Sequence, residues 1–299
     1  MKKLLLFLSV LLILQPVYTH AAFDDMRPSA RARGMGNAFV GLADDATAIF
    51  YNPAGLSQLS LIQLYTTYQK PYGLDFLKYY GIAAAFPTSR LGTFAISGQQ
   101  FGVDYRGVEL ETELTMSFGH GISLMNDVHS SLAFGYTVNY FQLKFAESVN
   151  GVAGSDQGTL GIDIGVFATI RNRTKVGFAV KNFNSPTFGD NLKKDLARRL
   201  AFGVSYEPYS GIITSGALEK KTGYDTRGLA GIEAEIFEFA SLRLGLQSHP
   251  NNITAGLGLK YFGGIFDYAL AYHNVLGATH QFAISYSFDS AFKKEAGTK

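Results

Sequence analysis

The chain has 299 residues, of which 17% are charged, a formal net charge of +2 at pH 7, and no cysteine. This charged fraction lies below the roughly 25% that is usual for soluble domains. The absence of cysteine excludes disulfides, thiolate metal sites, cysteine nucleophiles and lipoprotein acylation. Because the lysines and arginines are few and scattered, the sequence gives no reason to expect nucleic-acid binding.

Residues 1–21 have the pattern of a secretory signal. Two lysines precede an apolar run at 4–14 that only Ser9 interrupts, and the sequence THA at 19–21 ends with small residues at the −3 and −1 positions of a cleavage site. We therefore expect cleavage after Ala21. An uncleaved anchor helix is the alternative, but the run is shorter than the ~20 apolar residues that span a bilayer. No later segment is apolar enough for a membrane helix, so a membrane protein with this sequence would have to be a barrel.

The segment 30–59, ARARGMGNAFVGLADDATAIFYNPAGLSQL, is rich in glycine and alanine and reads as the only helical part of the chain. Small residues allow the backbone to pack closely against neighbouring walls. Met35, Phe39 and Leu42 recur at i, i+4 and i+7, which predicts that they share one face of a short helix.

A second short helix is predicted over 46–51. Asp44 or Asp45 stands where an N-cap belongs. Pro53 disfavours the α region at Asn52, so the helix should end there. Asn52 and the two aspartates could also owe their presence entirely to capping backbone groups.

From residue 61 to the end, apolar residues alternate with small or polar ones. The clearest stretch is 159–170, where every second residue is aliphatic except Ala168. Strands of ~9–12 residues suit a tilted crossing of a bilayer, whereas soluble strands average nearer 5–6. The glycine-, alanine- and serine-rich second face suits a crowded lumen, and tyrosine and phenylalanine concentrate toward strand ends. These features favour a membrane barrel over a soluble sandwich.

The alternation predicts about fourteen strands, an even number as in bacterial single-chain barrels. Their expected spans are 61–69, 77–86, 92–101, 108–122, 130–145, 158–170, 175–184, 197–207, 210–220, 227–237, 241–249, 252–262, 264–274 and 279–288.

The connections give a further check. If the helical segment starts on the periplasmic side, the first strand runs outward. The tight connections at 171–174 and 263–264 are then periplasmic, and the two longest, 146–158 and 185–196, are outside. Short turns inside and long loops outside are the outer-membrane pattern. The last strand ends on Phe288 before a polar tail.

The run RARGMGNAFVGLADDATAIFYNPAGL at 31–56 resembles the N-terminal signature of the FadL/PorV superfamily of outer-membrane barrels. That superfamily includes FadL-type transporters of long-chain fatty acids and aromatic hydrocarbons, and the PorV/PorQ group, some of which serve type IX secretion. The resemblance implies an all-β membrane protein of the bacterial outer membrane, with a 14-stranded antiparallel transmembrane β-barrel and an N-terminal helical hatch in its lumen. The domains would be a signal peptide (1–21), a hatch (22–60), a barrel (61–288) and a polar C-terminal tail (289–299).

By the same resemblance, the protein would mediate passage of small hydrophobic compounds across the outer membrane, past a hatch whose NPA element lies against the wall. The expected wall contacts are Asn52, Pro53, Ala54 and Gly55. The residues expected to pack the hatch, and to line a passage through a pocket of phenylalanine and tyrosine, are Gly34, Met35, Gly36, Phe39, Asp44, Asp45, Ile49 and Phe50.

The outer loops depart from this pattern, because long outer loops build the ligand-capture site of FadL-type transporters and those here are short. Two alternatives therefore stand beside uptake. One is a PorV/PorQ-like component of protein secretion or surface assembly, with secretion-system proteins as partners. The other is a structural barrel whose hatch is an inert plug. Outer-membrane lipid surrounds the barrel in every case.

Several charged residues are expected on the inward face. They include Asp163, Lys181, Glu233, Glu235, Arg243, Lys260 and Asp267, together with His273 and the acidic series Glu109, Glu111 and Glu113. We interpret them as lumen charges that pair across the barrel, although an acidic cluster also suits a cation. No nucleophile, base and orienting group can be placed together, and the six histidines lack metal-ligand spacing. The sequence thus predicts no enzyme, no cofactor and no metal site.

Overall fold

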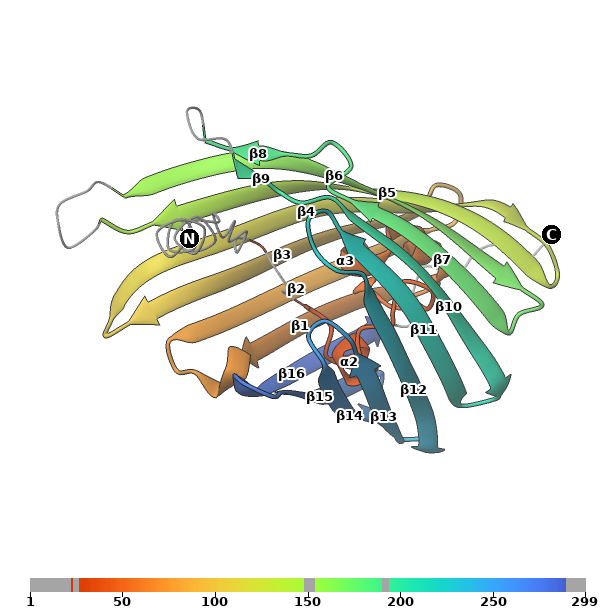
Figure 1. Cartoon of the computed structure of the whole chain (residues 1–299). Helices are drawn as coiled ribbons and strands as arrows, with labels where there is room; N and C mark the ends of the chain where they lie inside the picture. Colours follow the sequence, from red (N-terminus) through yellow and green to blue (C-terminus); the bar gives the residue numbers. More distant parts are fainter. Residues whose placement is uncertain (1–22, 24–26, 148–153, 190–193, 289–299) are drawn as a thin grey trace, which may run out of the picture.

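A computed structural model describes residue 23 and residues 27–147, 154–189 and 194–288. Fourteen antiparallel strands close into a barrel in which the first strand pairs with the last. Residues 27–59 lie inside the ring of strands (Figure 1). The barrel strands are β1 (Ile62–Lys70), β2 (Leu77–Thr88), β3 (Gly92–Tyr105), β4 (Val108–Asn126), β5 (Ser130–Phe145), β6 (Ser155–Ile170), β7 (Thr174–Lys181), β10 (Arg199–Tyr209), β11 (Ile212–Lys221), β12 (Arg227–Phe237), β13 (Ala240–Gln247), β14 (Asn252–Tyr261), β15 (Gly264–His273) and β16 (Gly277–Phe288).

The predicted architecture is confirmed, and the expected strand ends differ from the observed ones by only a few residues. In β6, for example, Leu160 faces the outside of the barrel and is 57% exposed, whereas Asp163 faces the inside and is 7% exposed. One element was missed. The connection after β7 contains two strands of two residues each, β8 (Thr187–Phe188) and β9 (Lys194–Asp195), which pair with each other and are separate from the barrel sheet.

The segment inside the barrel, which we call the hatch (27–59), contains three short helical elements. They are α2 (Ala30–Gly34), α3 (Ala48–Tyr51) and the 3-10 helix η1 (Pro53–Gln58). In the described residues, no helix is long and apolar enough to cross a membrane.

The helix expected over Met35, Phe39 and Leu42 does not form, and that prediction is wrong. Helix α2 ends before Met35, and both Gly36 and Asn37 take the left-handed conformation with φ of 62°. The cause is the wall: a Cβ at Gly36 would lie 2.6 Å from the carbonyl oxygens of two barrel strands, so the backbone turns away from the helix. The three apolar side chains nevertheless share one buried core.

The second helix begins later than predicted. Helix α3 starts at Ala48, and Asp45 caps the turn before it by accepting a hydrogen bond from the Thr47 amide at 2.8 Å. The helix ends before Asn52, whose extended backbone (φ −149°, ψ 100°) is the conformation favoured before Pro53. The Asn52 side chain then caps η1 by accepting from the Ala54 amide at 3.2 Å.

The hatch crosses the lumen in the direction opposite to the one assumed. Phe23 packs on Phe141 and Phe188, with ring centroids 5.1 and 5.5 Å apart, at the end of the barrel that carries the long connections. Leu59 precedes β1 at the end of the short turns. The first strand therefore runs toward the long connections, as expected, although the hatch starts on that side.

The hatch backbone rests directly on the barrel wall, at positions where strands carry glycine. A Cβ would lie 1.9 Å from the Val40 carbonyl oxygen at Gly177, 2.1 Å from the Asn52 side chain at Gly165, and 2.0 Å from the Gly36 amide at Gly245. We call this set of inward-facing positions the glycine seat. Its members are Gly119, Gly121, Gly135, Gly165, Gly177, Gly203, Gly231, Gly245 and Gly256, on strands β4 to β7, β10 and β12 to β14.

Gly177→Ala should therefore destabilise the folded protein. The new methyl group would force the hatch off the wall, and overpacking of this kind costs roughly 1–3 kcal/mol. Gly102→Ala is the matched control, because no atom lies within 4 Å of a Cβ added there. Thermal unfolding in detergent, followed by circular dichroism, should show a lower midpoint for the first variant only. Equal midpoints would show that the hatch does not rest on this strand.

Candidate ligand passage in the barrel lumen

Two large cavities lie on opposite sides of the hatch in the described part of the lumen. The outer cavity, of about 350 Å³, lies beside the long connections and is lined by residues such as Arg33, Gln69 and His273. The inner cavity, of about 340 Å³, lies beside the short turns and is lined by residues such as Arg31, Glu233 and Lys260. Both are in the size range of small-molecule sites. Both are also walled by β1 and by β14 to β16.

Three arginines attach the hatch to the barrel by their side chains. Arg27 binds Glu219 of β11 at 2.9 Å, and Arg31 binds Glu233 of β12 at 2.8 Å. Arg33 differs from both, because it donates to the amide oxygens of Gln281 at 2.5 Å and Gln69 at 2.7 Å instead of to a carboxylate. The hatch is thus fixed to strands on both sides of the β1–β16 seam.

Arg31 is the centre of a charged group within the hatch. It also binds Asp44 at 2.6 Å and Asp45 at 3.4 Å. Burial disfavours its cation, but attraction from Asp44 and Glu233 is larger in sum and holds the pKa of Arg31 above its ordinary value. Burial raises the pKa of Asp45. Asp44 and Asp45 therefore help to hold the hatch together. The N-cap of α3 is Thr47, so neither aspartate caps the helix itself, although Asp45 accepts from the Thr47 amide just before it.

The expected lumen charges pair across strands. Arg243 lies between Glu233 and Asp267, at 2.5 Å from each, and Lys260 pairs with Glu235 at 3.1 Å nearer the solvent. These pairs place oppositely charged side chains on adjacent strands of the inner face, where desolvated charges need partners.

Two other predicted lumen charges bind polar groups near the hatch. Asp163 accepts from the Asn139 amide at 3.0 Å, and Lys181 donates to the Phe50 carbonyl of the hatch. Among the described residues, no group of three histidine, aspartate or glutamate side chains could hold a metal ion.

Sequence reasoning missed the ion-pair centre at Glu219. This carboxylate is 5% exposed and faces Arg27 together with Arg199 at 3.6 Å and Arg227 at 3.9 Å. The signal that could have found it is the alternation of β11, where Glu219 follows Leu218, a side chain 58% exposed on the outer face. No signal in the sequence pairs it with Arg27.

The NPA element lies where the hatch meets the wall. Asn52 donates to the carbonyl oxygens of Val40 and Val166, each at 3.1 Å, which joins the hatch to β6. Pro53 and Ala54 lie on Gly135 of β5. Gly55 instead lies against Ala43 of the hatch itself, where a Cβ would be 2.2 Å from the carbonyl oxygen.

The other hatch residues that were expected to line a passage lie in the buried core between the hatch and the wall. Gly34 and Gly36 lie on Gly256 and Gly245 of the glycine seat. The larger side chains that were expected to line a passage are Met35, Phe39, Ile49 and Phe50, which are each at most 5% exposed. None of these four lines the outer or the inner cavity within the described chain.

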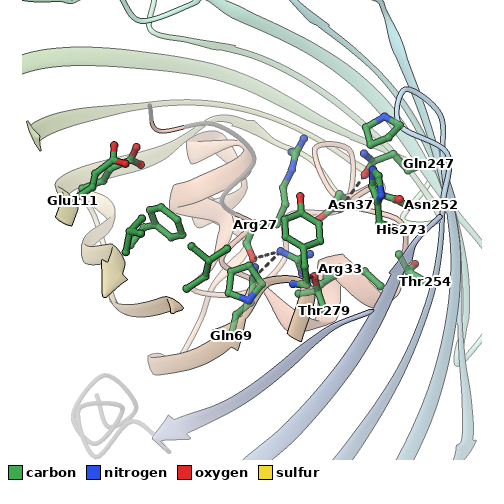
Figure 2. A pocket seen from close by; sticks show the side chains of 18 residues that line it. Arg27, Arg33, Asn37, Gln69, Glu111, Gln247, Asn252, Thr254, His273 and Thr279 are labelled. Atoms are coloured by element: carbon green, nitrogen blue, oxygen red, sulfur yellow. Dashed lines mark hydrogen bonds between the residues drawn. The ribbon is translucent and has the colours of Figure 1, made fainter. Parts of the chain in front are cut away.

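The outer cavity is more polar than the pocket of phenylalanine and tyrosine that was expected. Tyr72 and Phe101 contribute rings, but Arg33, Glu111 and Asn37 face the same space. Figure 2 shows Arg33 near its middle, Glu111 at one end, and Asn37 with Gln247 and Asn252 at the other. Asn37 donates to Gln247 at 3.3 Å.

These features define a class: a closed 14-stranded barrel whose lumen is shut by an N-terminal hatch. Solved structures share the overall fold. The chain is similar to the CymD monoaromatic hydrocarbon channel, with a TM-score of 0.65 and 12% identity over 89% of this chain and 99% of that one. It is similar to the Pseudomonas putida toluene transporter TodX, with a TM-score of 0.60 and 10% identity over 86% and 97%. A Pseudomonas aeruginosa FadL homologue gives a TM-score of 0.56 and 11% identity over 86% and 98%.

The fold is therefore that of FadL/TodX-type outer-membrane barrels. No protein-family profile and no curated protein sequence matches the chain.

Proposed function

We propose that the protein is an outer-membrane channel that lets small hydrophobic compounds cross the outer membrane. The observation that carries this proposal is the shared barrel fold, since the structures with this fold include a monoaromatic hydrocarbon channel and a toluene transporter. Export through a signal peptide cleaved after Ala21 belongs to the same proposal, but that segment lies outside the described residues. So does the tail at 289–299.

The route we propose runs between α2 and the strands β15, β16 and β1. Both cavities border these strands, and the glycine seat does not extend to them. The hatch is held there by side chains instead: Tyr65 of β1 donates to the Pro28 carbonyl at 2.8 Å, and Arg33 binds Gln69 and Gln281. Side-chain contacts can break and re-form, so a small displacement of α2, which also lifts Gly34 off Gly256, would join the two cavities while the hatch backbone after α2 stays on the glycine seat.

Uptake is tested in a Gram-negative host that lacks such a channel. Cells that carry the protein in their outer membrane should accumulate radiolabelled toluene faster than cells with an empty vector. Equal rates, with the protein shown to be folded in the membrane fraction, would reject the proposal. Co-purification with a large secretion channel would instead support the PorV/PorQ-like alternative, which rests on the N-terminal motif alone.

A reversible disulfide between α2 and the barrel wall should abolish this uptake. The chain has no cysteine, and a Cβ on Gly34 of α2 would lie 3.1 Å from the Cα of Gly256 on β14. A Cβ on Gly256 would likewise lie 3.1 Å from the Cα of Gly34, so cysteine side chains at these two positions would be in direct contact. In the double variant Gly34→Cys/Gly256→Cys, oxidation should reduce toluene uptake to the empty-vector level, and reduction should restore it.

The two single-cysteine variants are the controls for that disulfide, and they should respond to neither treatment. Uptake that persists in the oxidised double variant would show that α2 does not move during passage.

A further inference from the structure

We infer that the outer cavity binds a small monocarboxylate, with the carboxylate on Arg33 and the apolar body on the wall formed by β2 and β3. This inference rests on the proposed uptake function and narrows it, from hydrophobic compounds in general to amphiphiles with one acidic head. The observations that carry it are the surroundings of Arg33, the chemistry of the cavity wall and the placement of the cavity's own acids.

Arg33 is a buried cation that contacts no carboxylate among the described residues. It is 8% exposed. Its Nε and one terminal nitrogen donate to neutral oxygens only: those of Gln281, Gln69 and the Arg27 backbone, the last at 3.4 Å. Its other terminal nitrogen, Nη1, has no acceptor in the described chain. Burying a guanidinium without a carboxylate is costly, and arginine forms its strongest contacts with carboxylates through two parallel hydrogen bonds.

The electrostatic surroundings also favour an anion at this point. Burial lowers the pKa of Arg33, and repulsion from Arg27 lowers it further. Apart from burial, the largest influences on its pKa come from Tyr51, Arg27 and two other tyrosines, not from an aspartate or a glutamate. Arg27 and Arg31, its neighbours in the hatch, each bind a glutamate, so Arg33 is the exception among the three. A bound carboxylate would supply the missing opposite charge.

An apolar wall lies beside Arg33. Gln69 of β1 pairs with Tyr79 of β2, which pairs with Phe101 of β3. Two residues further along these strands, toward the long connections, Leu77 pairs with Val103. Phe101, Leu77 and Val103 all line the outer cavity, so a ligand whose head contacts Arg33 can lay its body on these side chains.

The acids of the cavity fix which way such a ligand lies. Glu111 and Glu113 also line the cavity, but on β4, beyond Val103 and Phe101 in the order of strands. Figure 2 places Glu111 at the end of the cavity away from Arg33. A carboxylate near these acids would be repelled, so the head lies on Arg33, near the middle of the cavity, and the apolar body extends over β2 and β3 toward β4. The volume of about 350 Å³ suits a body of one aromatic ring or a short alkyl chain.

Benzoate binding to the purified full-length barrel in detergent, measured by isothermal titration calorimetry, tests the inference. Wild-type protein should bind benzoate at least about tenfold more tightly than its neutral isostere benzamide, because a hydrogen bond to a charged group contributes more than a neutral one. Arg33→Gln should weaken benzoate binding about ten- to a hundredfold and leave benzamide binding unchanged. Arg171→Gln, which removes the same charge from a short turn outside the cavity, should leave both affinities unchanged.

Three outcomes would overturn the inference: no benzoate binding by the folded wild-type protein, equal affinity for benzoate and benzamide, or unchanged benzoate binding in Arg33→Gln. Displacement of benzoate by inorganic phosphate at equal concentration would show a general anion site and would overturn it as well. If Arg33→Gln fails to fold, the comparison of benzoate with benzamide on wild-type protein decides alone. Toluene uptake without benzoate binding would reject the carboxylate site but support the proposed channel function. Benzoate binding without any uptake would support the carboxylate site but reject the proposed channel function.

Discussion

Deletion of residues 27–59 should convert the barrel from a closed to an open pore. The hatch fills the lumen, and the outer and inner cavities lie on its two sides, so its removal joins them into one passage. The strand pairing of the wall does not involve the deleted residues, because β1 begins at Ile62 and pairs with β2 and β16 along its length. Barrels of this strand number are wider than those of about eight strands, whose interior is just filled by side chains.

Single-channel recordings in planar bilayers would measure the effect of this deletion. Wild-type protein should show no steady conductance at voltages where the deletion variant opens stable, water-filled pores. In cells, the variant should also admit bulky antibiotics that the outer membrane normally excludes. A folded deletion variant that stays as closed as wild type would mean that another element of the barrel shuts the lumen.

The barrel could be predicted from the sequence because its strands obey a local rule. Each residue's face follows from the parity of its position, so Leu160 outward and Asp163 inward are both readable from the pattern of 159–170 alone. The glycines of the seat were visible as small inward residues for the same reason. Their purpose was not visible, since Gly177 meets Val40, a residue on the hatch far away in the sequence.

The contacts of the hatch could not be predicted because they join residues very distant in the chain. Arg27 and Glu219 are 192 positions apart, and Arg33 and Gln281 are 248 apart. Such pairs depend on the register of every strand between them and on the way the barrel closes.

The local conformation of the hatch was predicted wrongly for a related reason. The periodicity of Met35 and Phe39 reports correctly that both are buried, but the wall at Gly36 decides that the backbone between them is not helical.

Glu219→Gln should be among the most destabilising single substitutions in the chain. The carboxylate lies between the guanidinium groups of Arg27, Arg199 and Arg227, within 3.9 Å of each, and is nearly inaccessible to solvent. Neutralising one member of a buried ion-pair centre typically costs about 3–5 kcal/mol, because the remaining charges lose their compensation while staying desolvated.

Glu235→Gln is the control, because its pair with Lys260 is partly open to solvent and should contribute less than ~1 kcal/mol. Urea unfolding of the two variants in detergent, followed by circular dichroism, measures the loss of unfolding free energy in each.

Removing one of the three cations around Glu219 as well should recover part of the stability lost in Glu219→Gln. The double variant Glu219→Gln/Arg27→Met is therefore expected to unfold at a higher urea concentration than Glu219→Gln alone. If it unfolds at a lower concentration, the Arg27 side chain holds the hatch through contacts other than Glu219, and the buried carboxylate is not what compensates its charge.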